Sequence, residues 1–413
     1  MKRIIVVNMF VMAALLLPSM MSAHDFGVAG FYYNILSDST VEVTSFQDNI
    51  ANWYGDETPV FATGDIVIPD SVSYAGKTYL VTAIGEKAFF GKLSIKSVSM
   101  GNSVTTIAYR AFFRCEEMTS VTIGDGVTEI GKEAFKYCEK LETVNFGKSV
   151  KTLDYGAFSS CYKLTSVSLP NSLRTIGVDA FHITGLKSVT IPDSVTYIGG
   201  SAFCETHLSG DLIIPNSVTY IGWEAFWGCT GLTSVSIGNS VATIESNAFY
   251  NCNGLTELRI PDSVKTIGRY AFAYCTGLSS LSIPGSVTAI GTEAFRACTG
   301  LKDMYCEILR PGDVDMGLDC FREMHMASCL LHVPKGKAAS YRATAQWQDF
   351  KYMVEDINVR GDVNSDGEIT VADVTALVDC VLAKRHSESS DVNGDGETNV
   401  ADVTALVSII MDE

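Results

Sequence analysis

Two short acidic loops near the C-terminal end of the 413-residue chain have the residue types and spacing of a Ca²⁺-binding loop. The first, residues 362–373, reads DVNSDGEITVAD, and the second, residues 391–402, reads DVNGDGETNVAD. Oxygen-bearing residues occupy positions 1, 3, 5, 9 and 12, a glycine at position 6 permits the sharp turn, and the backbone carbonyl at position 7 offers a further oxygen. Hard oxygen donors at this spacing predict two Ca²⁺ sites.

Each loop leads into an apolar segment that predicts a short helix, Val374–Leu382 after the first loop and Val403–Met411 after the second. Neither loop has the entering helix of an EF-hand, and position 12 is Asp rather than Glu. Because the loop–helix unit is duplicated, the tail is expected to have a near two-fold surface. Its two helices are expected to pack through Leu377, Val381, Leu406 and Ile410.

This tail resembles a type I dockerin, a small all-α module whose two loop–helix repeats bind Ca²⁺ and dock onto cohesin modules of a scaffold protein. Dockerins commonly bring polysaccharide-degrading enzymes into cellulosome-like complexes. The resemblance places partner-binding residues where cellulosomal members often carry Ser-Thr, here Val371, Ala372, Val400 and Ala401, and the usual basic pair in the helix is absent. It implies Ca²⁺ ligands at Asp362, Asn364, Asp366, Glu368, Thr370 and Asp373, and at Asp391, Asn393, Asp395, Glu397, Asn399 and Asp402.

Most of the chain before this tail is one repeated unit. The pair Ala-Phe recurs ten times in steps of 23 residues, with one step of 22, and a period in this range indicates a leucine-rich-repeat solenoid. The unit that begins at Leu255 reads LTELRIPDSVKTIGRYAFAYC. Alternate residues of its first strand point inward, Pro261 ends that strand, and a second extended segment leads to a turn at Gly268. A short helical turn is expected to place Ala271 and Phe272 in the core.

The repeat is similar to the BspA-like leucine-rich repeat of bacterial surface proteins, in which a proline follows the strand and I-G-x-x-A-F-x-x-C closes the unit. The similarity runs from Asp65 to Cys306 and implies a β-rich solenoid that serves as a secreted or surface-displayed binding scaffold. We therefore expect a signal peptide at 1–23, an N-terminal cap at 24–63, a solenoid of about ten repeats at 64–305, a C-terminal cap at 306–358 and a dockerin-like Ca²⁺-binding domain at 359–413.

The chain begins like an exported protein. Lys2 and Arg3 precede an apolar run from Ile4 to Leu17, which predicts a signal peptide cleaved after Ala23 and is too short to cross a membrane as a helix. The net charge of −17 becomes −19 without Lys2 and Arg3, and such acidity disfavours nucleic acid or anionic membranes as partners. The expected location is extracellular or at the cell surface, with no membrane insertion after cleavage.

The segments that flank the repeats are expected to close the two ends of the solenoid. The first repeat carries an insertion from Tyr74 to Tyr79 that predicts a small hairpin. Cys320-Phe321 is interpreted as a degenerate eleventh copy of the Ala-Phe pair. After it, Leu330–Pro334 predicts a final strand and residues 335–350 predict a helix.

Seven of the twelve cysteines fall in one column of the repeat. Stacked columns lie about 4.8 Å apart, a spacing that disulfides tolerate, but the first block of the column has three members and cannot pair completely. Buried free thiols are the prediction for this ladder, whereas a bridge among Cys306, Cys320 and Cys329 is left open. The ladder comprises Cys115, Cys138, Cys161, Cys229, Cys252, Cys275 and Cys298.

Two surfaces of the solenoid could bind a host or microbial protein or glycan. Outward positions of the strands are mostly Ser and Thr, which equally suit a plain exposed sheet. Aromatic side chains with interspersed arginines flank the Ala-Phe pairs and form a possible ligand ridge, although packing between neighbouring turns explains them equally well. The ridge comprises Tyr109, Arg110, Phe113, Trp223, Trp227, Tyr250, Tyr270 and Tyr274.

No group of residues predicts catalysis. The six histidines lack metal-ligand spacing. Glu133, Asp179, Glu224 and Glu293 precede the Ala-Phe pair, where acids are expected to favour a helix N-terminus rather than to face each other as glycosidase carboxylates. The sequence thus favours a non-catalytic binding or adhesion scaffold with a Ca²⁺-dependent docking module. The alternative is a component of an extracellular polysaccharide-degrading, cellulosome-like complex, in which the solenoid is the substrate-binding part or an unrecognised O-glycosyl hydrolase.

Overall fold

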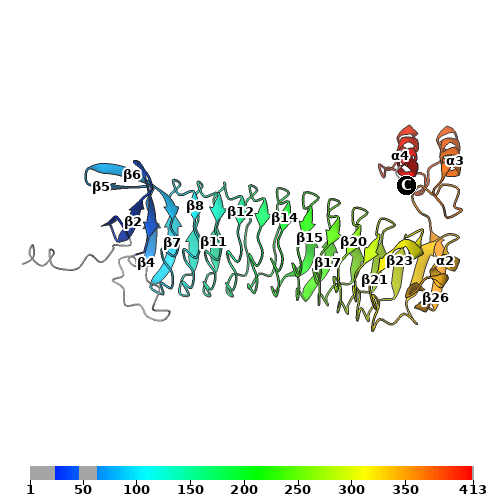
Figure 1. The fold of residues 1–413 in the computed structure, drawn as a ribbon, viewed down its shortest axis with the longest axis horizontal. Helices are drawn as coiled ribbons and strands as arrows, with labels where there is room; N and C mark the ends of the chain where they lie inside the picture. Colours follow the sequence, from blue (N-terminus) through cyan, green and yellow to red (C-terminus); the bar gives the residue numbers. More distant parts are fainter. Residues whose placement is uncertain (1–23, 46–62, 412–413) are drawn as a thin grey trace, which may run out of the picture.

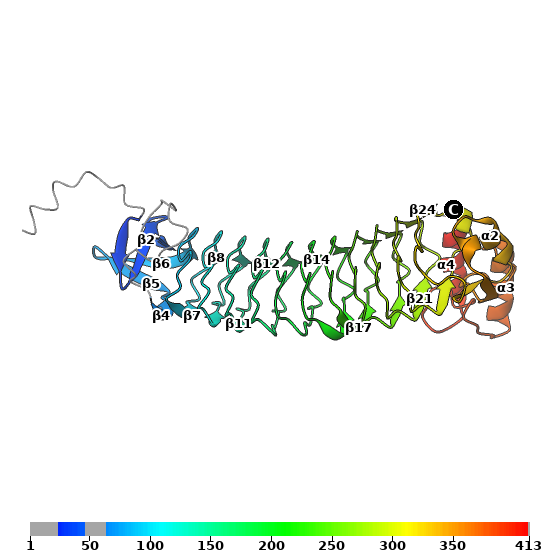
Figure 2. The same cartoon turned by 90° about the horizontal axis from the view of Figure 1, so that it is seen from below.

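The computed structural model describes residues 24–45 and 63–411. The repeats stack side by side into a long solenoid, and the two helices of the tail lie beside its C-terminal end (Figures 1 and 2). The predicted signal peptide and residues 46–62 of the predicted N-terminal cap lie outside the described residues. Among the helices that the structure describes, none has both the length and the apolar character needed to cross a membrane.

One sheet runs along the whole solenoid and takes a short strand from each turn. Within the repeats, successive strands of this sheet pair in parallel one repeat apart, as in Thr266 opposite Thr243. This confirms the predicted second extended segment of the unit. In sheet order the strands are β1 (Phe26–Val28), β2 (Phe31–Ile35), β3 (Thr40–Thr44), β6 (Lys77–Ile84), β8 (Thr106–Ile107), β10 (Glu129–Ile130), β12 (Thr152–Leu153), β13 (Thr175–Ile176), β14 (Tyr197–Ile198), β16 (Tyr220–Ile221), β18 (Thr243–Ile244), β20 (Thr266–Ile267), β22 (Ala289–Ile290) and β24 (Asp315–Met316).

The predicted first strand of the unit forms two further parallel sheets instead of one continuous sheet. Between them, two repeats share only an isolated bridge from Ser166 to Ser188, so the expectation of a strand in every repeat is wrong there. One of these sheets contains β4 (Gly64–Ile68), β7 (Ile95–Met100), β9 (Ser120–Thr122) and β11 (Thr143–Asn145). The other contains β15 (Ser209–Ile213), β17 (Gly231–Ser236), β19 (Glu257–Arg259), β21 (Ser280–Ile283), β23 (Asp303–Cys306), β25 (Leu330–Pro334) and β26 (Tyr352–Ile357).

The Ala-Phe segment forms consecutive tight turns and no helix, so the predicted helical turn is wrong. Within one turn the Ala271 N–H donates to the Gly268 carbonyl at 3.2 Å, and Tyr270 has a positive φ of 54°. The Phe272 N–H then donates across to the Ala294 carbonyl of the next repeat at 2.9 Å. A helix would use these N–H groups internally, whereas tight turns free them to bond the neighbouring repeat.

Gly268 lies where neighbouring repeats approach each other closely, which differs from the predicted role in the turn. A Cβ added at this position would lie 2.6 Å from the backbone nitrogen of Ser246 in the preceding repeat. A separation that short is within van der Waals overlap, so a side chain here requires the two turns to shift locally. Other repeats accommodate a side chain in this column, which holds Ala108, Asp154 and Glu245.

The core contains a continuous column of phenylalanine rings. The rings stack with centroids 4.9 Å apart between Phe89 and Phe112, and 5.7 Å apart between Phe272 and Phe295. Phe321 continues the column, with its ring centroid 6.0 Å from that of Phe295, which confirms the degenerate eleventh copy of the Ala-Phe pair. These rings are fully or almost fully buried, so each repeat is stabilised mainly by its two neighbours.

The N-terminal end is closed by strands. Antiparallel β1, β2 and β3 lie in the predicted N-terminal cap and extend the long sheet. The insertion from Tyr74 to Tyr79 joins β5 (Ser71–Tyr74) to β6 in an antiparallel hairpin, as predicted. This cap covers the exposed edge of the first repeat, which would otherwise be free to pair with another chain.

The C-terminal end combines a confirmed strand with a shorter helix than predicted. β25 has the predicted bounds, but the predicted helix at 335–350 is divided into α2 (Ala338–Ala343) and a 3₁₀ turn, η3 (Trp347–Asp349), by Gln346 with φ 65°. A further 3₁₀ turn, η2, spans Pro311–Asp313, and β26 adds an unpredicted last strand. Tyr341 and Trp347 are fully buried against the end of the phenylalanine column.

All twelve cysteines lie in the described part of the chain and all are free. The ladder thiols donate to carbonyls of the preceding repeat, as in Cys252 Sγ to Phe226 O at 3.2 Å. Burial raises the pKa of the Cys229 and Cys298 thiols to about 12, so almost no thiolate forms at neutral pH. The structure therefore agrees with the predicted ladder of buried free thiols and leaves Cys306, Cys320 and Cys329 unbridged.

Phe226→Ala is expected to destabilise the solenoid by about 3–5 kcal/mol, because the ring stacks between Phe203 and Phe249 and its loss leaves a cavity. Since contacts between repeats are local, hydrogen exchange should show lost protection mainly in the neighbouring repeats. Trp223→Ala, at a side chain 45% exposed, is the control and should change stability little. Uniform loss along the whole solenoid would contradict this register.

The ladder thiols are expected to resist iodoacetamide in the native protein and to react after denaturation, because they are buried and protonated. Cys380, which is only partly buried in the tail, is an internal control that should react faster in the native protein. Peptide mapping by mass spectrometry measures each site. Disulfide-linked peptides from adjacent repeats would contradict the free-thiol prediction.

Candidate functional site

The tail contains two helices, α3 (Val371–Leu382) and α4 (Val400–Met411), which start three residues earlier than predicted. The Thr370 side chain accepts a hydrogen bond from the Ala372 N–H, and the Asp373 carboxylate accepts one from the Thr370 N–H. This capping box begins α3 inside the loop, so the last predicted ligand lies in the first helical turn. The start of α3 and the end of the first predicted Ca²⁺-binding loop thus overlap.

The two helices pack together as predicted and form a small core of their own. Leu377 and Leu406 are fully buried, while Val381 and Ile410 pack against them in part. Val392, from the second loop, completes this core and was not predicted. Because so few apolar residues are buried, the packing of the tail provides little stability by itself.

Backbone N–H groups hold the carboxylates of the first loop in place. Asp362 accepts from the N–H groups of Asp366 and Gly367 at 3.1 and 3.0 Å. Asp373, at the other end of the loop, accepts from the N–H of Asn364 at 3.1 Å and from the N–H of Thr370. Gly367 has φ 85°, as the predicted sharp turn at position 6 requires. The first and last predicted ligands are therefore bonded into one closed loop.

The second loop repeats this arrangement and adds one hydrogen bond, from the Gly394 N–H to the Asp391 carboxylate at 2.9 Å. Asp391 accepts from the N–H groups of Asp395 and Gly396 at 3.1 and 3.0 Å, and Asp402 accepts from the N–H of Asn393 at 3.1 Å. Gly396 has φ 88°. Two loops with different residues at positions 4, 8 and 9 thus adopt the same hydrogen-bonded path.

Four of the carboxylates in these loops are buried, namely Asp362, Asp373, Asp391 and Asp402. Burial raises the pKa of Asp362 above its usual range, and the negative charges of Asp373 and Asp366 raise it further, while hydrogen bonds from backbone N–H groups act in the opposite direction. Like charges gathered in a buried loop are unfavourable without a cation. The loop therefore has the electrostatics of a cation site.

Acidic side chains alone do not complete either site. Across residues 24–45 and 63–411, no group of three or more His, Cys, Asp or Glu side chains is placed to hold a metal ion. The loops do supply other hard oxygens: the amide of Asn364 or Asn393, the hydroxyl of Thr370 and backbone carbonyls. Ca²⁺ accepts such mixed oxygen ligands, so these donors fit that ion.

The predicted partner-binding residues are all exposed at the start of the helices, with Val371 69% and Val400 70% accessible. Each helix continues this apolar surface at positions i+7 and i+11, which share one helical face. The apolar stripe formed in this way consists of Val371, Val378 and Leu382 on α3 and of Val400, Val407 and Met411 on α4. The helical spacing in the sequence contained this signal, but only Val371 and Val400 were predicted.

The first loop also rests on the C-terminal cap of the solenoid. A Cβ added at Gly367 would lie 2.6 Å from the Lys335 carbonyl oxygen, so the two backbones are in direct contact. The Lys337 ammonium lies 3.9 Å from the Glu368 carboxylate. The apolar stripe remains exposed in this arrangement, so the contact with the cap does not cover it.

The predicted ligand ridge is divided into two patches whose residues contact one another. In the first, the Arg110 guanidinium lies over the rings of Tyr109 and Phe113, at 4.9 and 4.7 Å from their centroids. In the second, Trp227 and Tyr250 meet edge to face at 5.9 Å. The Trp227–Tyr250 contact joins neighbouring repeats, as the packing alternative predicted, whereas the contacts of Arg110 lie within one repeat. Trp223 nevertheless stays 45% exposed.

The acids before the Ala-Phe pair do not begin helices, because Glu133, Asp179, Glu224 and Glu293 all have positive φ within the tight turns. The expectation of a helix N-terminus there is wrong. Glu133 instead forms ion pairs with Arg110 and Lys136, and these partners hold the pKa of its carboxyl below the usual value against the opposing effect of burial.

Comparison with known proteins identifies both parts of the chain. The family model described as BspA type leucine rich repeat region matches in six copies, over residues 82–209 and 198–310, and the model of the dockerin type I domain matches residues 360–411. A search of curated proteins finds no match.

Two of the similar solved structures are leucine-rich repeat proteins of bacteria. One, a leucine-rich repeat protein from Bacteroides ovatus ATCC 8483, is 27% identical with a TM-score of 0.45, and the match covers 81% of this chain and 100% of that one. Another, a leucine rich cell surface protein from Faecalibacterium prausnitzii A2-165, is 23% identical with a TM-score of 0.47, covering 84% of this chain and 98% of that one.

Proposed function

Because the chain belongs to the BspA-type leucine-rich-repeat family and ends in a type I dockerin domain, we propose that it is an exported, non-catalytic binding scaffold that docks through its tail. Leucine-rich repeats and dockerins are binding modules, and a dockerin implies a cohesin-type partner. The duplicated loop–helix unit, with the same hydrogen bonds in both copies, is the observation that carries this proposal. Export rests on the predicted signal peptide, with the domain limits proposed from the sequence.

Type I dockerins bind calcium, and we propose two ions in this tail, one in each loop. The ligands would be Asp362, Asn364, Asp366, the Glu368 carbonyl, Thr370 and Asp373, with Asp391, Asn393, Asp395, the Glu397 carbonyl, Asn399 and Asp402 in the second loop. Bound Ca²⁺ would neutralise carboxylates that are now buried together. Residues 361–413 carry twelve acidic side chains against Lys384 and Arg385, a net charge of −10 that two ions reduce to −6.

The apolar stripe is the proposed docking face. Three apolar side chains on each helix occupy equivalent positions, 29 residues apart, so the face presents nearly the same surface in two orientations. Apolar side chains that protrude singly from a module with little core are stabilised when a partner covers them. The absence of the usual Ser-Thr and basic pair favours a partner whose surface is more apolar than that of a cellulosomal cohesin.

We further propose that the solenoid is held in a fixed orientation to the docked partner. Only residues 358–361 separate β26 from the first loop, and that loop rests on the cap through Lys335 and Lys337. A scaffold held in this way would present its long sheet faces at a set angle. Its proposed partner is a surface protein or a polysaccharide-degrading assembly. The purified protein is expected to release no reducing sugar from a defined polysaccharide, which would support the non-catalytic proposal. Release of reducing sugar would contradict it.

Removal of Ca²⁺ is expected to unfold the tail and leave the solenoid intact, because stability rises as RT ln(1 + [L]/Kd) at each site. In the full chain, chelation should abolish amide protection of α3 and α4 in hydrogen exchange and leave β17 and β19 unchanged. Asp366→Ala with Asp395→Ala should act like chelation. Glu368→Gln with Glu397→Gln is the matched control, because it removes the same charge while the carbonyl ligands remain.

A tail that is equally protected with and without Ca²⁺, or the absence of heat in a calcium titration of the full chain, would contradict the two-ion proposal. Loss of Ca²⁺ binding in the Glu→Gln control would contradict the ligand assignment at position 7 alone.

Val371→Asp with Val400→Asp is expected to weaken docking to a cohesin module at least about tenfold, because a charge would be buried in the interface. Surface plasmon resonance of the full chain over a panel of type I cohesin modules measures this. Ser408→Asp, an exposed position of α4 outside the stripe, is the control and should bind like the unaltered chain. Equal weakening by both variants would contradict the stripe as the docking face.

A further inference from the structure

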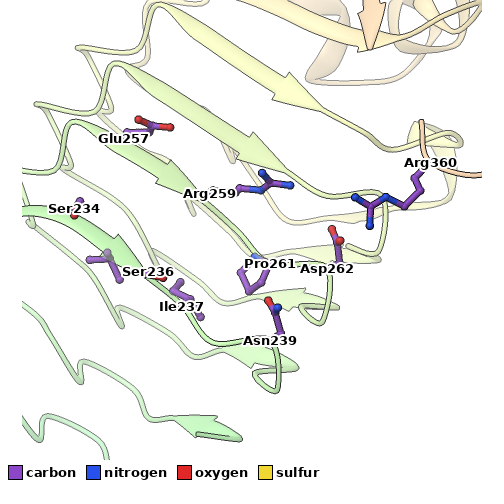
Figure 3. Close-up of a pocket in the computed structure, with 10 residues that line it drawn as sticks. Ser234, Ser236, Ile237, Asn239, Glu257, Arg259, Pro261, Asp262 and Arg360 are labelled. Atoms are coloured by element: carbon purple, nitrogen blue, oxygen red, sulfur yellow. The ribbon is translucent and has the colours of Figure 1, made fainter. Parts of the chain in front are cut away.

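A groove of about 510 Å³ opens on the outer face of the sheet near the C-terminal end of the solenoid, on the Ser- and Thr-rich strand face that the sequence indicated as a possible binding surface (Figure 3). Strands β17 and β19, together with the turns that follow them, form its floor and one wall. Arg360, in the segment that joins the solenoid to the tail, forms part of the opposite wall. The groove is thus built from both parts of the chain.

The side chains of the groove balance each other in charge. Glu257 and Asp262 carry two negative charges, and Arg259 and Arg360 carry two positive charges. The chain as a whole has a net charge of −17, so this groove is a locally neutral region of a strongly acidic protein. The apolar residues Ile237 and Pro261 lie between these polar groups and are buried.

Both arginines keep their hydrogen-bond donors free. Within the described residues, Arg259 and Arg360 form no ion pair and no side-chain hydrogen bond, whereas Arg110 and Arg296 of the solenoid are paired with Glu133 and Glu293. A guanidinium group has five N–H donors in a fixed plane. Two such groups that face the same groove beside a free carboxylate offer donors and acceptors at once.

We propose that this groove binds a neutral saccharide segment of a glycan. Neighbouring hydroxyls of a sugar each donate and accept, and they pair with planar polar side chains such as Asp262, Arg259 and Asn239. Ser234 and Ser236 add hydroxyls along the floor. The volume of the groove lies in the range of small-ligand sites. The inference rests on the proposed function in taking the solenoid as a binding scaffold.

The charge of the surroundings disfavours an anionic ligand. Glu307 lies beside the groove, and burial raises the pKa of its carboxyl, as do the charges of Asp262 and Glu388, while those of Arg259 and Arg360 lower it. The positive charges of the two arginines are therefore already offset by nearby acids. An anionic polysaccharide would also meet the acidic surface of the rest of the chain.

A peptide strand is disfavoured by the topology of the sheet. Peptides that add to a sheet need an edge with free N–H and carbonyl groups. Here β17 is paired with β15 and β19, and β19 is paired with β21, so neither strand has a free edge. Recognition in this groove depends on side chains alone, which favours a ligand rich in hydroxyl groups over an extended backbone.

Arg360 also contacts the tail, so the groove is connected to the docking module. A Cβ added at Gly394 of the second loop would lie 2.4 Å from Nη1 of Arg360, which shows that the guanidinium rests against that loop. The residue at the equivalent position of the first loop is Ser365, with φ 59°. Gly394→Ser is therefore tolerable for the loop backbone but would displace Arg360 from the groove wall.

The test uses the full chain in the presence of Ca²⁺ and titration calorimetry. The probes are cellohexaose, xylohexaose and mannohexaose as neutral saccharides, hexagalacturonate as an anionic one, and hexaglutamate as an acidic peptide. We expect at least one neutral hexasaccharide to bind, with Arg259→Gln and Asp262→Asn each weakening that binding about tenfold or more. Gly394→Ser should weaken it in the same direction. Arg269→Gln, an exposed arginine outside the groove, is the matched control and should bind within about twofold of the unaltered chain.

Four results would overturn the proposal: no binding of any neutral probe, binding of hexagalacturonate alone, binding of hexaglutamate alone, or neutral binding that Arg259→Gln and Asp262→Asn leave unchanged. Docking to the cohesin panel is measured on the same variants and should be unaffected by Arg259→Gln. Retained docking without saccharide binding would reject the groove and leave the proposed function standing. Failure of the unaltered chain to bind any cohesin module of the panel would reject the proposed function itself.

Discussion

The close approach of neighbouring repeats is the constraint on which the solenoid depends. Phe272 donates its N–H to the next repeat at 2.9 Å, and a Cβ at Gly222 would lie 2.4 Å from the backbone nitrogen of Gly200. At this separation the buried columns of the repeat hold side chains of similar size, because each buried residue faces its counterpart in the next repeat. The columns of Phe, Cys and Ala follow from that requirement, and so does the cap at each end, where a counterpart is missing.

The tail differs from the solenoid in that buried charge, rather than apolar packing, dominates its interior. Leu377 and Leu406 are fully buried there, while four aspartates are buried in the two loops. Backbone N–H groups satisfy the carboxylate oxygens but do not neutralise their charge. We therefore expect the two parts of the chain to be stable for different reasons: the solenoid through contacts between repeats, and the tail through bound Ca²⁺ that offsets the charge of its aspartates.

The junction between the two parts gives the molecule properties that neither has alone. A short segment after β26 brings the first loop against the cap and Arg360 into the groove of β17 and β19. Because the apolar stripe stays exposed, the proposed docking face and the proposed saccharide groove are accessible at the same time. A scaffold with these features would connect a partner and a ligand through one short junction rather than through a flexible tether.

The sequence by itself determined the features that depend on local spacing. The 23-residue period, the inward column that contains Phe272, the hairpin before Tyr79 and the two loops all follow from residue type and interval, and the structure places each as predicted. The start of α3 was predicted three residues too late, because a capping box at Thr370 allows the helix to begin before the last loop residue.

Only the tertiary structure decided what depends on residues far apart in the chain. The Ala-Phe segment forms tight turns rather than a helix, since its N–H groups bond the neighbouring repeat instead of their own. In the aromatic ridge, Trp227 of one repeat contacts Tyr250 of the next, so this part of the ridge is packed between repeats. Segments far apart in the chain meet where β26 pairs with β25, where the first loop contacts Lys335, and in the groove at Arg259. No single repeat specifies these contacts, so no spacing in the sequence could reveal them.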